Sequence, residues 1–122
     1  TASKKKKRWI KSPAQVEIEE YSARQVGTEQ LFRVEGAVSS PRSACWAGRT
    51  VMVHQITGGA DSVVATVKTT PPTSGESEGT FVATWTTPPN AFGFYAQVAP
   101  RKIKKKRIKC GGGVSDTVNL AG

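Results

Sequence analysis

The stretch Thr80-Phe81-Val82-Ala83-Thr84-Trp85-Thr86 decides the fold class of this chain. Its two large aromatic side chains, Phe81 and Trp85, share one side of an extended backbone with Ala83. Alternation with period two is typical of a β-strand that buries one face. A helix would repeat its apolar residues every three or four positions, and no segment does so convincingly. We therefore predict a strand over residues 80–86 with these three side chains in the core.

Six further segments predict strands in the same way. Val16-Glu17-Ile18-Glu19, in a segment from Gln15, opens the first, and Leu31 to Ser39 forms the second. Gly36 falls on the apolar side of the second segment, which indicates a bulge or close packing there. The others are predicted at residues 49–55, 62–69, 92–99 and 115–120. Seven strands separated by Gly, Pro and Ser turns predict an all-β, antiparallel sandwich or barrel.

The basic residues are concentrated in two short runs. The chain holds 18 Lys and Arg against 9 Asp and Glu, and 13 of the 18 lie within residues 4–11 and 101–109. A chain of 122 residues suits one domain. We expect residues 1–13 to form a flexible basic arm and residues 14–122 a single β-sandwich domain. Trp9 is expected to attach the end of the arm to the domain.

The cations of these runs are the candidate polyanion-binding residues. They are Lys4, Lys5, Lys6, Lys7 and Arg8 in the arm, and Arg101, Lys102, Lys104, Lys105, Lys106, Arg107 and Lys109 in the second run. We expect the second run to form a protruding hairpin that buries Ile103 and Ile108 near its base. Such a hairpin suits nucleic acid, teichoic acid or an anionic glycan. The alternative is a solvated loop whose charges discourage aggregation between sheet edges.

The two cysteines, Cys45 and Cys110, are 65 residues apart. A bridge between them would close a long loop and remove about 4 kcal/mol of unfolded-state entropy. We expect this bridge, and the alternative is a pair of buried thiols in a reducing compartment. A metal site needs three or four ligands, and His54 cannot complete one with two distant cysteines. No metal or other cofactor is therefore expected.

The sequence does not favour an enzyme. His54 is the one imidazole of the chain, and the alternation over residues 49–55 turns it outward. No nucleophile motif, phosphate loop or paired-carboxylate signature accompanies it. Four glutamates are expected on exposed strand faces: Glu17, Glu19, Glu20 and Glu35. Asn119, a residue type that can form isopeptide bonds with lysine, is expected to face solvent.

Three stretches, in chain order, resemble a known group of domains. Ser43-Ala44-Cys45-Trp46-Ala47-Gly48-Arg49-Thr50-Val51-Met52-Val53 is similar to a cysteine-turn-strand pattern. Glu78-Gly79-Thr80-Phe81-Val82-Ala83-Thr84-Trp85 is similar to a turn-Gly-x-aromatic strand, and Phe92-Gly93-Phe94-Tyr95-Ala96-Gln97-Val98 to a Gly-x-Tyr-x-Ala strand. These patterns resemble the Ig-like or transthyretin-like (carboxypeptidase regulatory) sandwich modules of bacterial secreted and surface proteins. Phe92 and Phe94 depart from them, since glycine and tyrosine are usual there.

The resemblance implies a non-catalytic structural or adhesive module, such as a spacer or accessory domain, that is secreted or displayed on the cell surface. Its partner would be an anionic cell-surface polymer or another surface protein. The alternative is a polyanion- or nucleic-acid-binding protein that uses the basic arm and the hairpin at residues 101–109. No run of 18 apolar residues is present, so no membrane span is expected. No signal peptide is visible in the sequence either.

Overall fold

The computed structural model describes residues 8–58, 60–72, 78–87 and 92–120. Within these residues the chain forms strands, one short 3₁₀ turn η1 (Ser43–Cys45) and no α-helix. The strands are β1 (Ile10–Ser12), β2 (Gln15–Val26), β3 (Glu29–Ser39), β4 (Thr50–Thr57), β5 (Ala60–Lys68), β6 (Glu78–Thr87), β7 (Gly93–Val98), β8 (Arg101–Ile103), β9 (Ile108–Cys110), β10 (Gly113–Val114) and β11 (Val118–Asn119). The fold is therefore all-β, as the alternation predicts.

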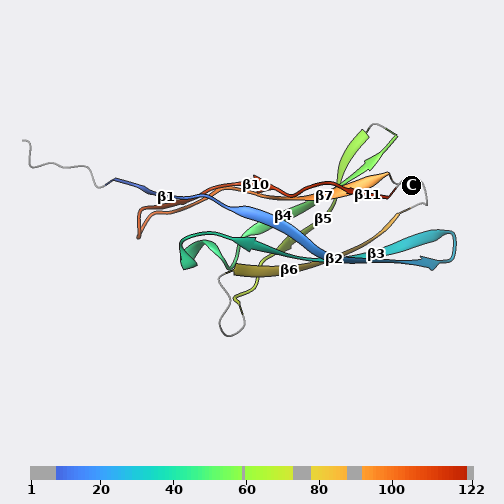
Figure 1. Cartoon of the computed structure of the whole chain (residues 1–122), viewed down its shortest axis with the longest axis horizontal. Helices are drawn as coiled ribbons and strands as arrows, with labels where there is room; N and C mark the ends of the chain where they lie inside the picture. The colour runs from blue at the N-terminus through green and yellow to red at the C-terminus, as the bar shows by residue number, and fades with distance from the viewer. Residues whose placement is uncertain (1–7, 59, 73–77, 88–91, 121–122) are drawn as a thin grey trace, which may run out of the picture.

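The strands form three sheets (Figure 1). The first, in the order β2-β3-β6, is antiparallel. The second has the order β10-β7-β4-β5, with β11 also paired to β7, and it too is antiparallel. The third has the order β1-β9-β8, and its β1–β9 pair is parallel. The third sheet extends from one end of an elongated body, and the β2–β3 hairpin extends from the other (Figure 1).

One hydrophobic core lies between the first two sheets. The rings of Phe32 and Trp85 stack with centroids 5.3 Å apart, and Phe94 packs edge-on against both. The three side chains predicted on the core side of residues 80–86 are all buried. The core cluster also contains Val16, Val34, Val38, Val51, Val53, Ala96 and Val98. Removal of these side chains from water provides the main free energy that holds the two sheets together.

Gly36 is a position of close packing. A Cβ atom there would lie 2.5 Å from Cζ of Phe81 and 2.4 Å from the main-chain oxygen of Glu17. The pairing of β2 with β3 does shift register, but in the partner strand, between Ile18 and Glu20. Of the two predicted explanations for this glycine, close packing is confirmed.

Three predictions about organisation need correction. The described residues hold eleven strands rather than seven, and one pair is parallel. Residues 10–12 of the predicted arm form strand β1, in which Ser12 is buried. Of the closing strand predicted at residues 115–120, only Val118–Asn119 forms a strand, β11, while β10 comes before the predicted range. Short strands of two or three residues, several of them rich in lysine, lack the repeated apolar alternation on which prediction depends.

Candidate polyanion-binding site at the basic end

The third sheet places three lysines in one row. Lys11 of β1 is paired with Lys109 of β9, and Lys109 is paired with Lys102 of β8. Side chains of directly paired residues project from the same face of a sheet, and neighbouring strands are about 4.8 Å apart. The three ammonium groups are therefore carried by one face, although the residues come from opposite ends of the chain.

Residues on both sides of the row share this surface, since two cations lie over the Trp9 ring and one pocket is lined by the three lysines together with two prolines and a glycine. Trp9 and Arg107 lie two positions from Lys11 and Lys109 towards the hairpin tip. Proline and glycine lie two positions away on the side of the body. We call this surface the basic face. Its residues are Trp9, Lys11, Pro13, Pro100, Lys102, Arg107, Lys109 and Gly111.

The opposite face of the third sheet is anchored to the body. Ile108 is buried in a small cluster with Cys45 and Cys110, and Ile103 packs against it. The predicted Cys45–Cys110 disulfide is present in the structure. The predicted hairpin is also confirmed, since β8 pairs with β9. The prediction that its two isoleucines lie near the base is wrong: Ile103 and Ile108 form the pair next to the turn. One side of the sheet is therefore fixed, and the other side is left to face solvent.

A buried arginine holds the base of this sheet. The Arg49 guanidinium is 1% exposed and donates hydrogen bonds to the main-chain oxygens of Cys45 (3.0 Å), Ala99 (2.9 Å) and Gly111 (2.7 Å). Burial lowers the pKa of Arg49, and the charge of Arg101 lowers it further. These bonds tie the bridged turn, the start of β8 and the end of β9 to one side chain. The alternation over residues 49–55 predicts a strand that begins at Arg49 but does not indicate this role.

Two cations of the basic face lie close to the Trp9 ring. The Arg107 guanidinium carbon is 5.9 Å from the indole ring centroid, and the Lys109 ammonium is 5.6 Å from it. Cations within about 6 Å of an aromatic face are attracted to its electron density. The Ile10 amide also donates to the Arg107 carbonyl at 2.7 Å. The predicted attachment through Trp9 is thus confirmed, and it fixes the ring beside the lysine row.

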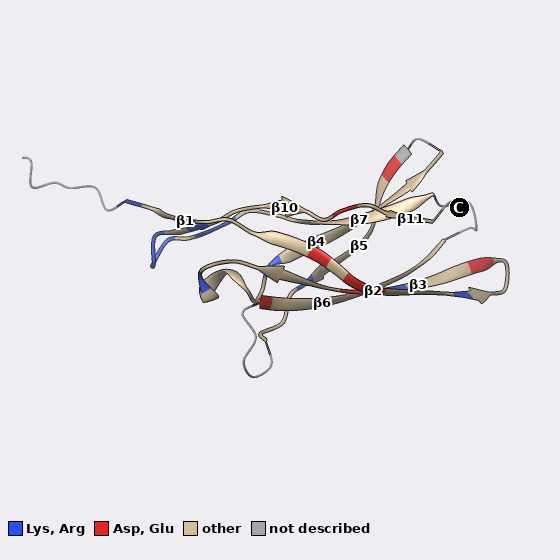
Figure 2. Ribbon diagram, in the orientation of Figure 1, with Lys and Arg blue, Asp and Glu red and all other residues tan. Residues whose placement is uncertain are grey.

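The charges of the molecule are segregated. Figure 2 shows basic residues gathered at the β1 and β8–β9 end and acidic ones mainly over β2 and β3. Two ion pairs, Arg33–Glu35 and His54–Asp61, lie away from the basic end. Like charges held together on a low-dielectric surface create a positive potential that attracts anions.

A shallow pocket of about 440 Å³ opens beside the lysine row. The lining surface is almost entirely apolar. Its lining residues are Lys11, Ser12, Pro13, Pro100, Arg101, Lys102, Lys109, Cys110 and Gly111. Because the lining is almost entirely apolar, the lysines contribute mainly the carbon atoms of their side chains to it, so the pocket combines a carbon floor with neighbouring cations.

The predicted site residues are only partly brought together. Lys102, Arg107 and Lys109 join the basic face, and Lys104, Lys105 and Lys106 are exposed in the turn at its tip. Arg101 does not join it, since its guanidinium donates to the carbonyl of Ala47 at 3.3 Å. Arg8 is exposed next to Trp9. Lys4, Lys5, Lys6 and Lys7 lie outside the described residues.

Sequence reasoning missed Lys11, Pro13 and Pro100 as site residues. They became neighbours only through the parallel pairing of β1 with β9, which no local pattern indicates. One sequence feature could have indicated this pairing: Trp9 and Lys11 have the same spacing as Arg107 and Lys109, and both pairs lie in basic segments.

His54 belongs to a second polar cluster, on the outer face of the second sheet. Its Nδ1 lies 3.1 Å from a carboxylate oxygen of Asp61, and its Nε2 lies 2.9 Å from the amide oxygen of Gln97. The ring stacks on Tyr95 with centroids 4.7 Å apart, and the Tyr95 hydroxyl donates to Asp61. This hydrogen bond raises the pKa of Tyr95. The Gln97 amide oxygen is hydrogen-bonded to Nε2, the nitrogen that would otherwise activate a nucleophile. The geometry therefore suits a structural cluster.

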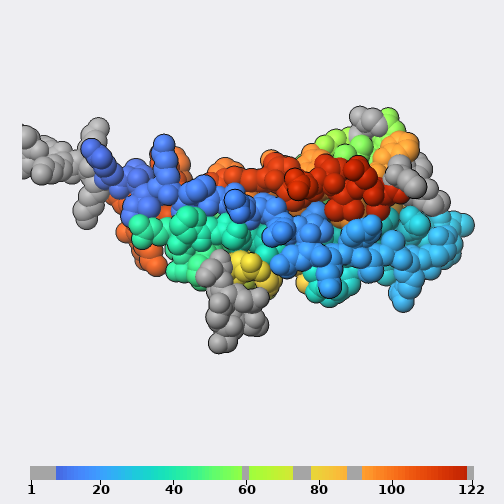
Figure 3. All heavy atoms as spheres, in the orientation of Figure 1, coloured from blue at the N-terminus to red at the C-terminus, as the bar shows by residue number. Residues whose placement is uncertain are grey.

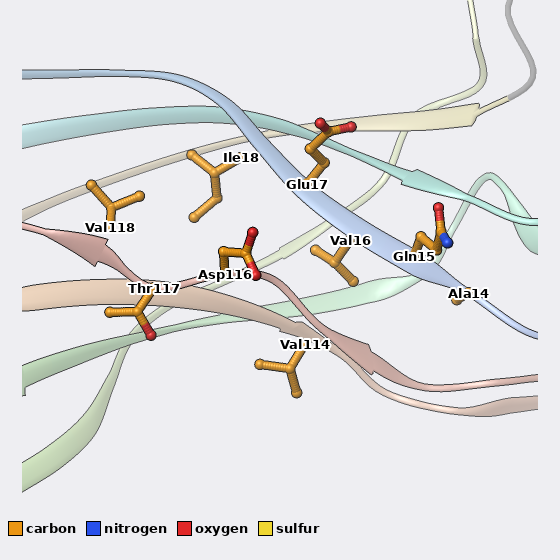
Figure 4. Close-up of a pocket in the computed structure, with 9 residues that line it drawn as sticks. All are labelled: Ala14, Gln15, Val16, Glu17, Ile18, Val114, Asp116, Thr117 and Val118. Atoms are coloured by element: carbon orange, nitrogen blue, oxygen red, sulfur yellow. The ribbon is translucent and has the colours of Figure 1, made fainter.

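A groove of about 530 Å³ lies between β2 and the β10–β11 segment (Figure 4). Figure 3 shows these two parts of the chain running alongside each other on the visible face. Val16 and Ile18 enter the groove from β2, and Val114 and Val118 from the other side (Figure 4). Glu17 and Asp116 also line it, so it carries no cation to complement an anion.

Comparison with known proteins finds no matching family model, no matching curated sequence and no matching solved structure. No helix within the described residues is long and apolar enough to cross a membrane. The described residues also contain no group of three or more His, Cys, Asp and Glu side chains arranged to hold a metal ion.

Proposed function

We propose that this protein is a non-catalytic module, secreted or displayed on a cell surface, that attaches to an anionic cell-surface polymer through its basic end. The observation that carries the proposal is the row of Lys11, Lys109 and Lys102 on the solvent face of a sheet whose other face is anchored. A solvated loop would have no need of a disulfide, a buried arginine and a parallel strand to hold its cations in register.

An Ig-like or transthyretin-like sandwich is part of this proposal. Two antiparallel sheets with a shared core, and a cysteine bridge from the turn before β4 to the end of β9, support it. Disulfides form and persist in oxidising compartments, which supports a location outside the cytosol. In such a module the two-sheet body would act as a spacer and the third sheet as the contact.

The test is binding of the full chain to inorganic polyphosphate over a series of salt concentrations. We expect an affinity that falls steeply with salt, because cations that neutralise the polymer release its counterions. Replacing Lys104, Lys105, Lys106 and Arg107 with serine should weaken binding strongly. The matched control, R24S/R33S/R42S/K68S, removes four cations from elsewhere and should bind more tightly than the hairpin variant. Equal affinities of the two variants would show that the basic end is not the binding site.

Nucleic acid is the second candidate, and the half-buried Trp9 is the observation that favours it, since a base can stack on an accessible part of an aromatic ring. Proteins that bind single strands usually supply several aromatic rings along a groove, and this face supplies one. Competition between a single-stranded oligonucleotide and polyphosphate decides between the two. A clear preference for the oligonucleotide at equal charge would favour the second candidate.

A further inference from the structure

The basic face carries a feature that a purely ionic partner would not use. The pocket of about 440 Å³ beside the lysine row has an almost wholly apolar lining, with Pro13, Pro100 and Gly111 on the body side of the row. Polyphosphate has no carbon surface to bury there. A ligand that fits both parts must combine acidic groups with an apolar face.

Trp9, on the other side of the lysine row, also indicates a ligand that has an apolar face as well as acidic groups. The ring is only half-buried, and it is held at 5.6 Å from the Lys109 ammonium. Sugar rings present a face of C–H groups that packs on an aromatic ring, and acidic sugars carry carboxylate or sulfate groups at their edge. Aromatic side chains in such positions supply contact area as well as polarity.

We infer that the basic face binds an anionic glycan, a polysaccharide bearing sulfate or uronic-acid groups. Its acidic groups pair with Lys11, Lys109 and Lys102, and its sugar rings rest on Trp9 and on the pocket floor. The inference rests on the proposed function, because it assigns a ligand class to the same anion-binding end. Charge complementarity selects the acidic groups, and the carbon surfaces on both sides of the row select the sugar.

The geometry also indicates how the glycan lies. Lys11, Lys109 and Lys102 cross three adjacent strands, so the outer two backbones are roughly 10 Å apart. Trp9 and the pocket lie on opposite sides of this row along the strands. The chain of sugars therefore crosses the row, with rings on either side and acidic groups above it.

The experiment compares a heparin-derived hexasaccharide with inorganic polyphosphate of the same charge, using the full chain. Affinities are measured over a range of salt and extrapolated to 1 M, where counterion release no longer contributes. We expect the hexasaccharide to retain affinity at 1 M salt and polyphosphate to retain none. The W9A variant should lose about five- to tenfold in hexasaccharide affinity, and its polyphosphate affinity should change less than twofold. F92A removes an exposed ring next to the start of β7, at the end of that strand away from β8. This variant should change the affinity for neither ligand.

Each result has a separate meaning. If W9A lowers the affinity for both ligands by the same factor, the ring only positions the lysines, and the glycan assignment is wrong. If a single-stranded oligonucleotide matches the hexasaccharide in affinity and in its dependence on Trp9, the ring stacks bases and the assignment is again wrong. In both cases the proposed attachment to an anion remains. If neither the hexasaccharide nor polyphosphate binds, the proposed function fails as well.

Discussion

The Arg49 guanidinium donates a hydrogen bond of 2.7 Å to the main-chain oxygen of Gly111, which lies 62 residues further along the chain. The same nitrogen also donates to the carbonyl of Ala99 at 2.9 Å. One buried side chain therefore joins both strands of the basic hairpin to the start of β4. Its two terminal nitrogens donate only to main-chain carbonyls, and its buried Nε has no hydrogen-bond partner among the described residues.

Replacing Arg49 with methionine should destabilise the fold by about 3 kcal/mol, because three buried carbonyls lose a charged donor. Urea denaturation measures this as a lower midpoint. The control is R42M at an exposed position, which should stay within about 0.5 kcal/mol of the wild type. A stability of R49M equal to that of R42M would show that the three hydrogen bonds contribute nothing.

Removing the disulfide should lower stability by about 4 kcal/mol, since the bridge closes a long loop in the unfolded chain. The C45S/C110S variant and the wild type in reductant should unfold at the same urea concentration. Amide exchange should also become faster in β8 and β9 than in the core strands, because the bridge anchors these strands. A wild-type midpoint that reductant does not move would contradict both expectations.

Stability should depend on Tyr95 at alkaline pH. The Tyr95 hydroxyl donates to Asp61, which raises the pKa of Tyr95 in the folded protein. The contribution is therefore complete below the unfolded value of about 10 and is lost as pH rises through the higher folded value. Above about pH 10 the wild type should lose stability more steeply than Y95F, as measured by urea midpoints at several pH values. Parallel curves would mean that the hydrogen bond does not form in solution.

The long strands could be predicted because each repeats the alternation of apolar and polar residues several times. Phe81, Ala83 and Trp85 alternate with polar residues and all point into the core. Val51 and Val53 do the same in β4, with His54 on the other side as expected. In each case burial of one face fixes the register, so local sequence is sufficient.

The basic face could not be predicted, because it depends on pairing between distant short strands. Nothing near Lys11 indicates that it lies beside Lys109, and Ile10–Ser12 is too short to show alternation. Arg49 was missed for a related reason: its burial depends on carbonyls at Ala99 and Gly111, which the fold brings to it. The His54 cluster likewise draws Asp61, Tyr95 and Gln97 from two other strands.

The most direct measurement compares two variants of equal charge for binding to the heparin-derived hexasaccharide. The K11Q/K102Q/K109Q variant replaces all three lysines of the row with uncharged glutamine. The R24Q/R42Q/K68Q variant removes three exposed cations elsewhere. If the row is the contact, the first variant should lose most of the affinity, and the slope of log affinity against log salt should fall by about 3. The second variant should keep nearly the wild-type affinity and slope. Equal losses in the two variants would show that binding follows net charge alone, and that the arrangement of the basic face has no part in it.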